Sequence, residues 1–199
     1  MNTIEKLESL QGMIADDKGT ILLVSGGLKP AGLVVVQGEP FRRSSEIVHI
    51  HPSVTTTLDE ILEDLNIKYF TATTIMDALP NKIYDQEQEV MRIFISKNQE
   101  TAQQLMIAFD DLQNNHHLVG TLLGYPGTAI DAFLTPDMLE LSNHPTATQE
   151  VSETNMRLLG HRLSKAHWRD EVKYLEPAGN YIKSVSSKIY SEATAEDAV

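Results

Sequence analysis

Two histidines, His49 and His51, are the clearest candidates for metal chemistry in the sequence. They lie two positions apart in residues 46–51, a segment whose pattern predicts a β-strand, so both imidazoles would share one face. Such a pair can bind one metal ion, but it needs a third ligand and hydrogen bonds that orient the rings. His116, His117 or one of many carboxylates could supply that ligand in space. The alternative is a pair of exposed strand histidines without metal.

The segment from residue 25 to residue 32 combines glycines and a lysine after an apolar run, as phosphate-binding loops do. Its spacing matches neither Gly-x-x-x-x-Gly-Lys-Ser/Thr nor Gly-x-Gly-x-x-Gly, and a predicted strand rather than a helix follows it. Ser25 precedes two glycines, but the Gly-x-Ser-x-Gly pattern of a nucleophile elbow is absent. We therefore interpret the segment as a long hairpin loop.

Residues 116–142 give the strongest structural signal, three short helical patterns separated by two breaks. Asn115 suits the N-cap of the first helix, and Gly124 suits its C′ position, where a left-handed backbone favours glycine. Pro126 fits the first position of the second helix, because its missing N–H needs no partner there. A Thr-Pro dipeptide at residues 135–136 predicts the start of a third helix in the same way.

Tyr125, Gly127 and Thr128 are the candidate ligand-binding residues of this stretch. The backbone N–H groups of Gly127 and Thr128 would lie at the start of the second helix, where an anion can bind. The alternative is a helical corner that packs one part of the protein and contacts no ligand.

The same stretch resembles a signature of an uncharacterised prokaryotic family. The resemblance rests on Leu122-Leu123-Gly124-Tyr125-Pro126, followed by Ile130 and Phe133. In that family the Gly-Tyr-Pro motif is followed, one residue later, by two adjacent cysteines. This chain has Thr128 and Ala129 at those positions, so the resemblance implies no thiol or metal chemistry here.

The composition is that of a globular protein without cysteine. A chain of 199 residues, 41% hydrophobic and 22% charged, can form one domain or two small ones with a buried core. The lack of cysteine excludes disulfides, cysteine–zinc sites and cysteine nucleophiles, and it suits a reducing cytosol. We expect a cytoplasmic protein, because the N-terminal residues lack a signal peptide's apolar region and no run of about 18 apolar residues occurs.

The formal net charge of −12 predicts that nucleic acid and anionic membranes are not partners. Basic residues gather at residues 41–43 and between residues 157 and 173. Acidic residues are interleaved with the second group, which is typical of a solvated helix face.

Five strands are expected in the N-terminal half, each from an apolar run or an alternating pattern. They are residues 21–24, 33–36, 46–51, 67–73 and 90–96. Helices are expected from Thr3, from a capping box that begins at Thr57, and briefly from Thr74.

After Lys97 the sequence predicts helices only. Asn98, Ser164 and Pro177 each mark the start of a helix whose apolar residues recur at helical spacing. The predicted fold is therefore α+β. A mixed sheet of about five strands with covering helices is expected in residues 1–97, and an all-helical part is expected in residues 98–199. The sequence leaves open whether the two parts share one core.

Two classes of function are compatible with these patterns. The first is a non-enzymatic binding or regulatory protein that recognises a protein or a small molecule and carries no cofactor. The second is a metal-assisted hydrolase or related enzyme that uses His49 and His51. Metal analysis of protein purified without a histidine tag would separate the two.

Overall fold

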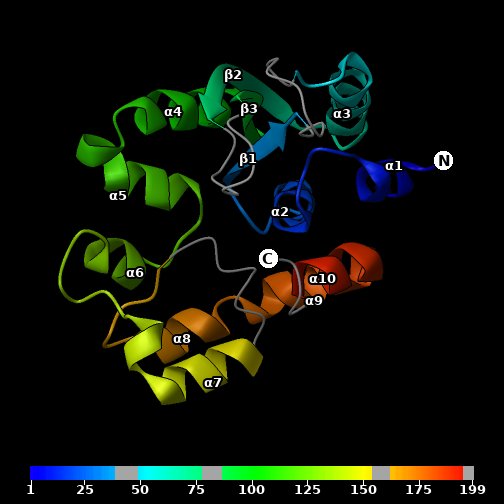
Figure 1. Cartoon of the computed structure of the whole chain (residues 1–199). Coiled ribbons are helices and arrows are strands. Elements are labelled where there is room, and N and C mark those ends of the chain that lie inside the picture. The colour runs from blue at the N-terminus through cyan, green and yellow to red at the C-terminus, as the bar shows by residue number, and fades with distance from the viewer. Residues whose placement is uncertain (39–48, 78–86, 154–161, 195–199) are drawn as a thin grey trace.

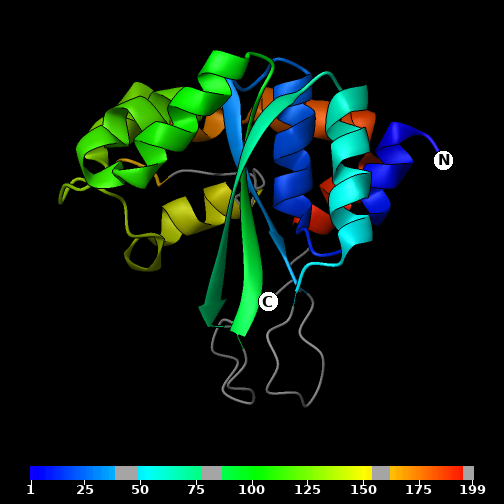
Figure 2. The same ribbon diagram turned by 90° about the horizontal axis from the view of Figure 1, so that it is seen from above.

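The computed structural model describes residues 1–38, 49–77, 87–153 and 162–194. In it a small sheet lies between two groups of helices (Figure 1, Figure 2). The strands are β1 (Ala31–Gln37), β2 (Lys68–Asp77) and β3 (Glu87–Ser96). The helices are α1 (Thr3–Ser9), α2 (Ala15–Ser25), α3 (Pro52–Asp64), α4 (Gln99–Asp110), α5 (Leu112–Leu122), α6 (Gly127–Ala132), α7 (Pro145–Glu153), α8 (Trp168–Lys173), α9 (Glu176–Val185) and α10 (Ser187–Thr194), with a 3₁₀ turn, η1 (Leu141–Asn143).

Within the described residues, the sheet has three strands in the order β1-β3-β2, and both pairings are antiparallel. The prediction of a mixed sheet of about five strands is therefore wrong, although the α+β class holds coarsely. Strands do form at the predicted segments 33–36, 67–73 and 90–96. Residues 21–24 instead belong to α2, where all four side chains are buried. A continuous apolar run fits a buried helix as well as a buried strand.

The predicted strand at residues 46–51 lies partly outside the described residues. His49 and Ile50 have no strand assignment, and His51 is the N-cap of α3. The helix α3 therefore begins before the capping box expected at Thr57. The short helix expected from Thr74 is also wrong, because the antiparallel ladder between β2 and β3 continues to Asp77. Pairing with β3 overrides the local sequence there.

The central strand β3 faces two different cores on its two sides. Ile93 and Ile95 belong to the main core, together with Val34 of β1 and residues of α1, α2, α3, α9 and α10. Phe94 points to the opposite face, where Ala31 and the apolar residues of α4 and α5 form a second core. This alternation along β3 confirms the predicted period of two.

The main core contains residues from both predicted parts of the chain. Ile182 of α9 and Ile189 of α10 are fully buried against the same cluster as Leu22 of α2. Figure 1 shows α9 and α10, in orange and red, beside the blue helices of the N-terminal segment. Side chains from both sides of the boundary drawn after Lys97 thus complete one core.

The third predicted helix of the central stretch is absent from residues 135–139, which form turns and a bridge. The Thr135 hydroxyl donates to the Ala132 carbonyl and accepts from the Asp137 N–H, which forms a tight turn. The Leu139 N–H then donates to the Leu163 carbonyl at 2.8 Å. This long-range bond uses a backbone N–H that a helix would need.

None of the described helices is both long and apolar enough to cross a lipid bilayer.

Candidate functional site

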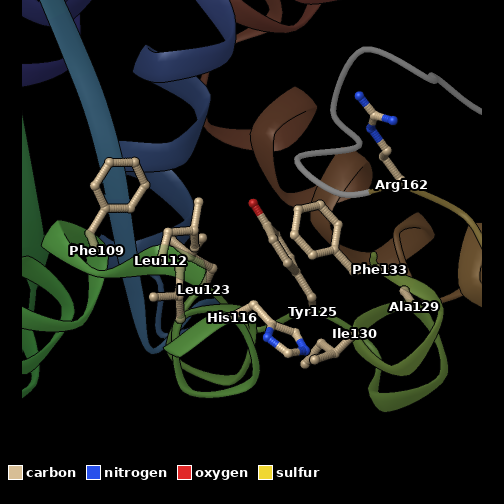
Figure 3. A pocket seen from close by; sticks show the side chains of 11 residues that line it. Phe109, Leu112, His116, Leu123, Tyr125, Ala129, Ile130, Phe133 and Arg162 are labelled. Carbon is tan, nitrogen blue, oxygen red and sulfur yellow. The ribbon is translucent and has the colours of Figure 1, made fainter. Parts of the chain in front are cut away.

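A cavity of about 360 Å³ lies where α5 meets α6 (Figure 3). Its lining is mainly apolar and comes from α4, α5, α6, the turn between α5 and α6, and the segment before α8. The lining residues are Phe109, Leu112, His116, Val119, Gly120, Leu123, Tyr125, Ala129, Ile130, Phe133 and Arg162. This size and this mixture of many apolar and few polar groups are typical of small-molecule sites.

Helix α5 and its C-cap residue together supply nearly half of the lining, because their cavity-facing residues recur at helical spacing. They are Leu112, His116, Val119, Gly120 and Leu123. The helix begins at Leu112 rather than after Asn115 as predicted, and Asn115 itself has a non-helical backbone (φ −118°, ψ 15°). Gly120 allows α6 to approach closely, because an added Cβ would lie 2.7 Å from Cγ1 of Ile130.

The turn after α5 places Tyr125 in the cavity wall. Gly124 has a φ of +74°, which confirms the predicted left-handed C′ position. Its N–H donates to the Thr121 carbonyl at 3.0 Å, and the Tyr125 N–H donates to the Gly120 carbonyl at 2.9 Å. These two bonds form a Schellman motif, which ends the helix in a fixed direction. Pro126 is the N-cap of α6, one position earlier than predicted.

Burial raises the pKa of the Tyr125 hydroxyl to about 12. The phenol is therefore neutral at physiological pH and cannot act as a base there. The Nζ of Lys29 lies 5.6 Å from the centre of the Tyr125 ring, which adds a cation–π contact. In Figure 3 the hydroxyl points away from the imidazole of His116, so the two polar groups mark different parts of the cavity.

His116 provides the most unusual polar atom of the site. Its Nδ1 is buried, and it has no hydrogen-bond partner within the described part of the chain. The ring packs 4.8 Å from the ring of His117 and 6.3 Å from that of Phe133, measured between ring centres. A buried polar atom without a partner costs about 1–3 kcal/mol, so a bound group that hydrogen bonds to it would recover that energy.

Of the three predicted ligand-binding residues, only Tyr125 lines the cavity. The Thr128 hydroxyl donates to Oε1 of Glu171 at 2.6 Å. Glu171 is 2% exposed and also accepts from the N–H and hydroxyl of Ser164, at 2.7 and 2.6 Å. Gly127 is exposed at the start of α6. The hydrogen bond between Thr128 and Glu171 thus connects α6 with α8 and stabilises the cavity wall that α6 forms.

The predicted metal residues lie in another part of the fold. His51 Nδ1 accepts from the Ser53 N–H and lies 2.7 Å from the Ser53 hydroxyl oxygen, which commits this nitrogen to the start of α3. His49 Nδ1 lies 3.3 Å from a carboxylate oxygen of Glu89. Among the described residues, no group of three histidines or carboxylates is arranged to hold a metal ion.

Sequence reasoning missed His116 and Arg162 as members of one site. A signal for His116 did exist, because it lies at helical spacing between Leu112 and Val119 and interrupts an apolar stripe. Arg162 gave no such signal, because the fold alone brings it to a cavity formed by residues 109–133.

A comparison of the chain with protein-family models, curated proteins and solved structures gives no match.

Proposed function

We propose that this is a non-enzymatic binding protein whose ligand is a small, largely apolar molecule held in the cavity between α5 and α6. The apolar lining favours a ligand with a hydrophobic body, such as fused aromatic rings, because burying that surface provides the main driving force. Phe109, Phe133 and Tyr125 add aromatic surface for stacking.

The observation that carries the proposal is that His116 lines the cavity while its Nδ1 is buried and has no hydrogen-bond partner in the described part of the chain. Neutral imidazole can accept a hydrogen bond at this nitrogen, so a ligand hydroxyl or N–H fits it. An apolar cavity alone would also bind ligands, but without preference for a hydrogen-bond donor.

Two probes that differ in this single feature test the proposal. 2-Naphthol carries a hydroxyl donor, whereas 2-methoxynaphthalene has nearly the same shape and no donor. We expect calorimetric titration of the intact protein to give up to about tenfold tighter binding of 2-naphthol. One buried hydrogen bond contributes up to about 1.4 kcal/mol, which corresponds to a tenfold difference in affinity.

Three variants test whether Nδ1 of His116 causes the preference for 2-naphthol. His116→Phe should bind both probes about equally, because it keeps an aromatic ring and removes Nδ1. His167→Phe changes an exposed histidine outside the cavity and should keep the preference. Ala129→Leu should weaken both probes, because Ala129 lines the cavity and is 4% exposed. Failure of both probes to bind the wild-type protein would overturn the proposal.

A further inference from the structure

Among the described residues that line the cavity, Arg162 is the only one with a permanent charge. It is exposed, and Figure 3 shows its guanidinium well away from the imidazole of His116. A ligand that fills the cavity would therefore meet a hydrogen-bonding nitrogen at one place and a cation at another.

The guanidinium of Arg162 has no carboxylate within ion-pair distance in the described ranges, although the chain has 28 acidic and 16 basic residues. Where ion pairs do form, as between Arg169 and Glu150 at 3.0 Å and between Lys6 and Glu60 at 2.7 Å, the cation's charge is partly neutralised. The recorded contact of Arg162 runs from Nη1 to Sδ of Met138 at 3.7 Å, and a thioether is a weak acceptor.

None of the described residues that line the cavity is an Asp or a Glu. The guanidinium of Arg162 is thus the fixed charge among the described lining residues, and the Nζ of Lys29 lies 5.6 Å from the centre of the Tyr125 ring. The net charge of −12 repels anions at long range, but salt screens that repulsion over a Debye length of about 8 Å in cells. Contact with Arg162 decides the sign of the charge that the cavity accepts.

We infer that the ligand is an apolar carboxylic acid, bound as its carboxylate with the oxygens on Arg162 and the hydrophobic body in the cavity. This inference rests on the proposed binding function and adds the class of ligand. A planar guanidinium matches a carboxylate with two parallel hydrogen bonds, and such charge-assisted bonds are about twice as strong as neutral ones.

An isosteric pair of probes separates charge from shape. 2-Naphthoate and 2-naphthamide differ in the carboxylate alone, and both are titrated at pH 8 in 0.15 M salt. The wild-type protein should bind the carboxylate about five- to tenfold more tightly, which is the effect of a partly exposed charge-assisted pair. The preference should shrink as salt is raised to 0.5 M.

Arg162→Gln should weaken 2-naphthoate to the level of the amide and leave the amide unchanged. Its folding should be unaffected, because Arg162 is exposed. Lys68→Gln removes an exposed positive charge from β2, outside the cavity, and should keep the preference.

The outcomes separate this inference from the proposed function. Equal affinity of the two probes for the wild-type protein, or a preference that survives Arg162→Gln, overturns the carboxylate assignment while binding itself stands. If neither this pair nor 2-naphthol binds, the proposed function fails and the assignment fails with it.

Discussion

A single backbone angle at Gly124 sets the direction in which the chain leaves α5 and enters the cavity wall. With φ at +74° an added side chain is strained, and its Cβ would also lie 3.0 Å from Cδ of Pro30. We expect Gly124→Ala to lower the free energy of unfolding by about 1 kcal/mol or more in urea melts.

Gly127→Ala is the matched control for this substitution. An added Cβ at Gly127 has no neighbour within 4 Å, and the residue lies in the first turn of α6. Its stability should change by less than about 0.5 kcal/mol, or rise slightly, because alanine favours a helix. Equal effects of the two substitutions would contradict the Schellman assignment.

Thr128 is predicted to act through Glu171 rather than through a ligand. Thr128→Val keeps the shape and removes one of three donors to a buried carboxylate. Hydrogen bonds to charged groups contribute about 1.5–3 kcal/mol, so stability in thermal or urea unfolding should fall by that amount. Thr121→Val, whose exposed hydroxyl bonds only within its own helix, should be nearly neutral. Weaker probe binding with unchanged stability would instead support the predicted role of Thr128 as a ligand contact.

At the scale of elements, α2 and the segment just before it cover the outer edge of the sheet at β1. The Val35 N–H donates to Oδ2 of Asp17 at 3.1 Å, and the Gln37 N–H donates to the Gly12 carbonyl at 2.9 Å. Such partners protect an edge strand from pairing with other chains. Burial raises the pKa of Asp17 to about 6 from its ordinary value of 3.8, although the bond from Val35 opposes the shift.

The raised pKa of Asp17 predicts a definite pH dependence of stability. Between pH 3.8 and about 6 the unfolded chain has lost this proton while the folded protein still holds it. Unfolding is therefore increasingly favoured as pH rises through this window. Urea melts of the wild type and of Asp17→Asn give the free energy of unfolding of each at several pH values. The wild-type value minus the variant value should fall by about 1–3 kcal/mol between pH 4 and pH 7. A difference that is flat or that rises with pH would contradict the burial of this carboxyl group.

At the scale of the whole molecule, the C-terminal helices complete the main core. Ile189 of α10 is fully buried in the cluster that contains Leu22. Ile189→Ala should lower the free energy of unfolding by about 2–5 kcal/mol, whereas Ile107→Ala, at 61% exposed, should change it by less than about 0.5 kcal/mol.

A fragment of residues 1–97 provides a second test of this shared core. It lacks α9 and α10, so apolar residues of α2 that those helices cover would be exposed. We expect circular dichroism of the fragment to show no cooperative unfolding, and the full chain to unfold in one transition. A stable, cooperatively folded fragment would contradict this view.

Local sequence signals predicted the structure correctly where that structure depends on one short segment of the chain. The C′ glycine at 124, the alternation along β3 and the capping of α4 by Asn98 all follow from neighbours in the chain, and all are present. The same reasoning misplaced residues 21–24, because a run of four apolar residues carries no period that separates helix from strand.

The sequence by itself determined the local geometry around Gly124, the apolar stripe of α5 and the absence of cysteine chemistry. Only the tertiary structure decided that Arg162 reaches the cavity, that Thr128 bonds to Glu171 and that α10 packs on α2. The physical reason is the distance along the chain over which each kind of interaction acts. A cap or a helix stripe depends on residues within about four positions, whereas these contacts join segments far apart in the chain and form only when the whole core packs.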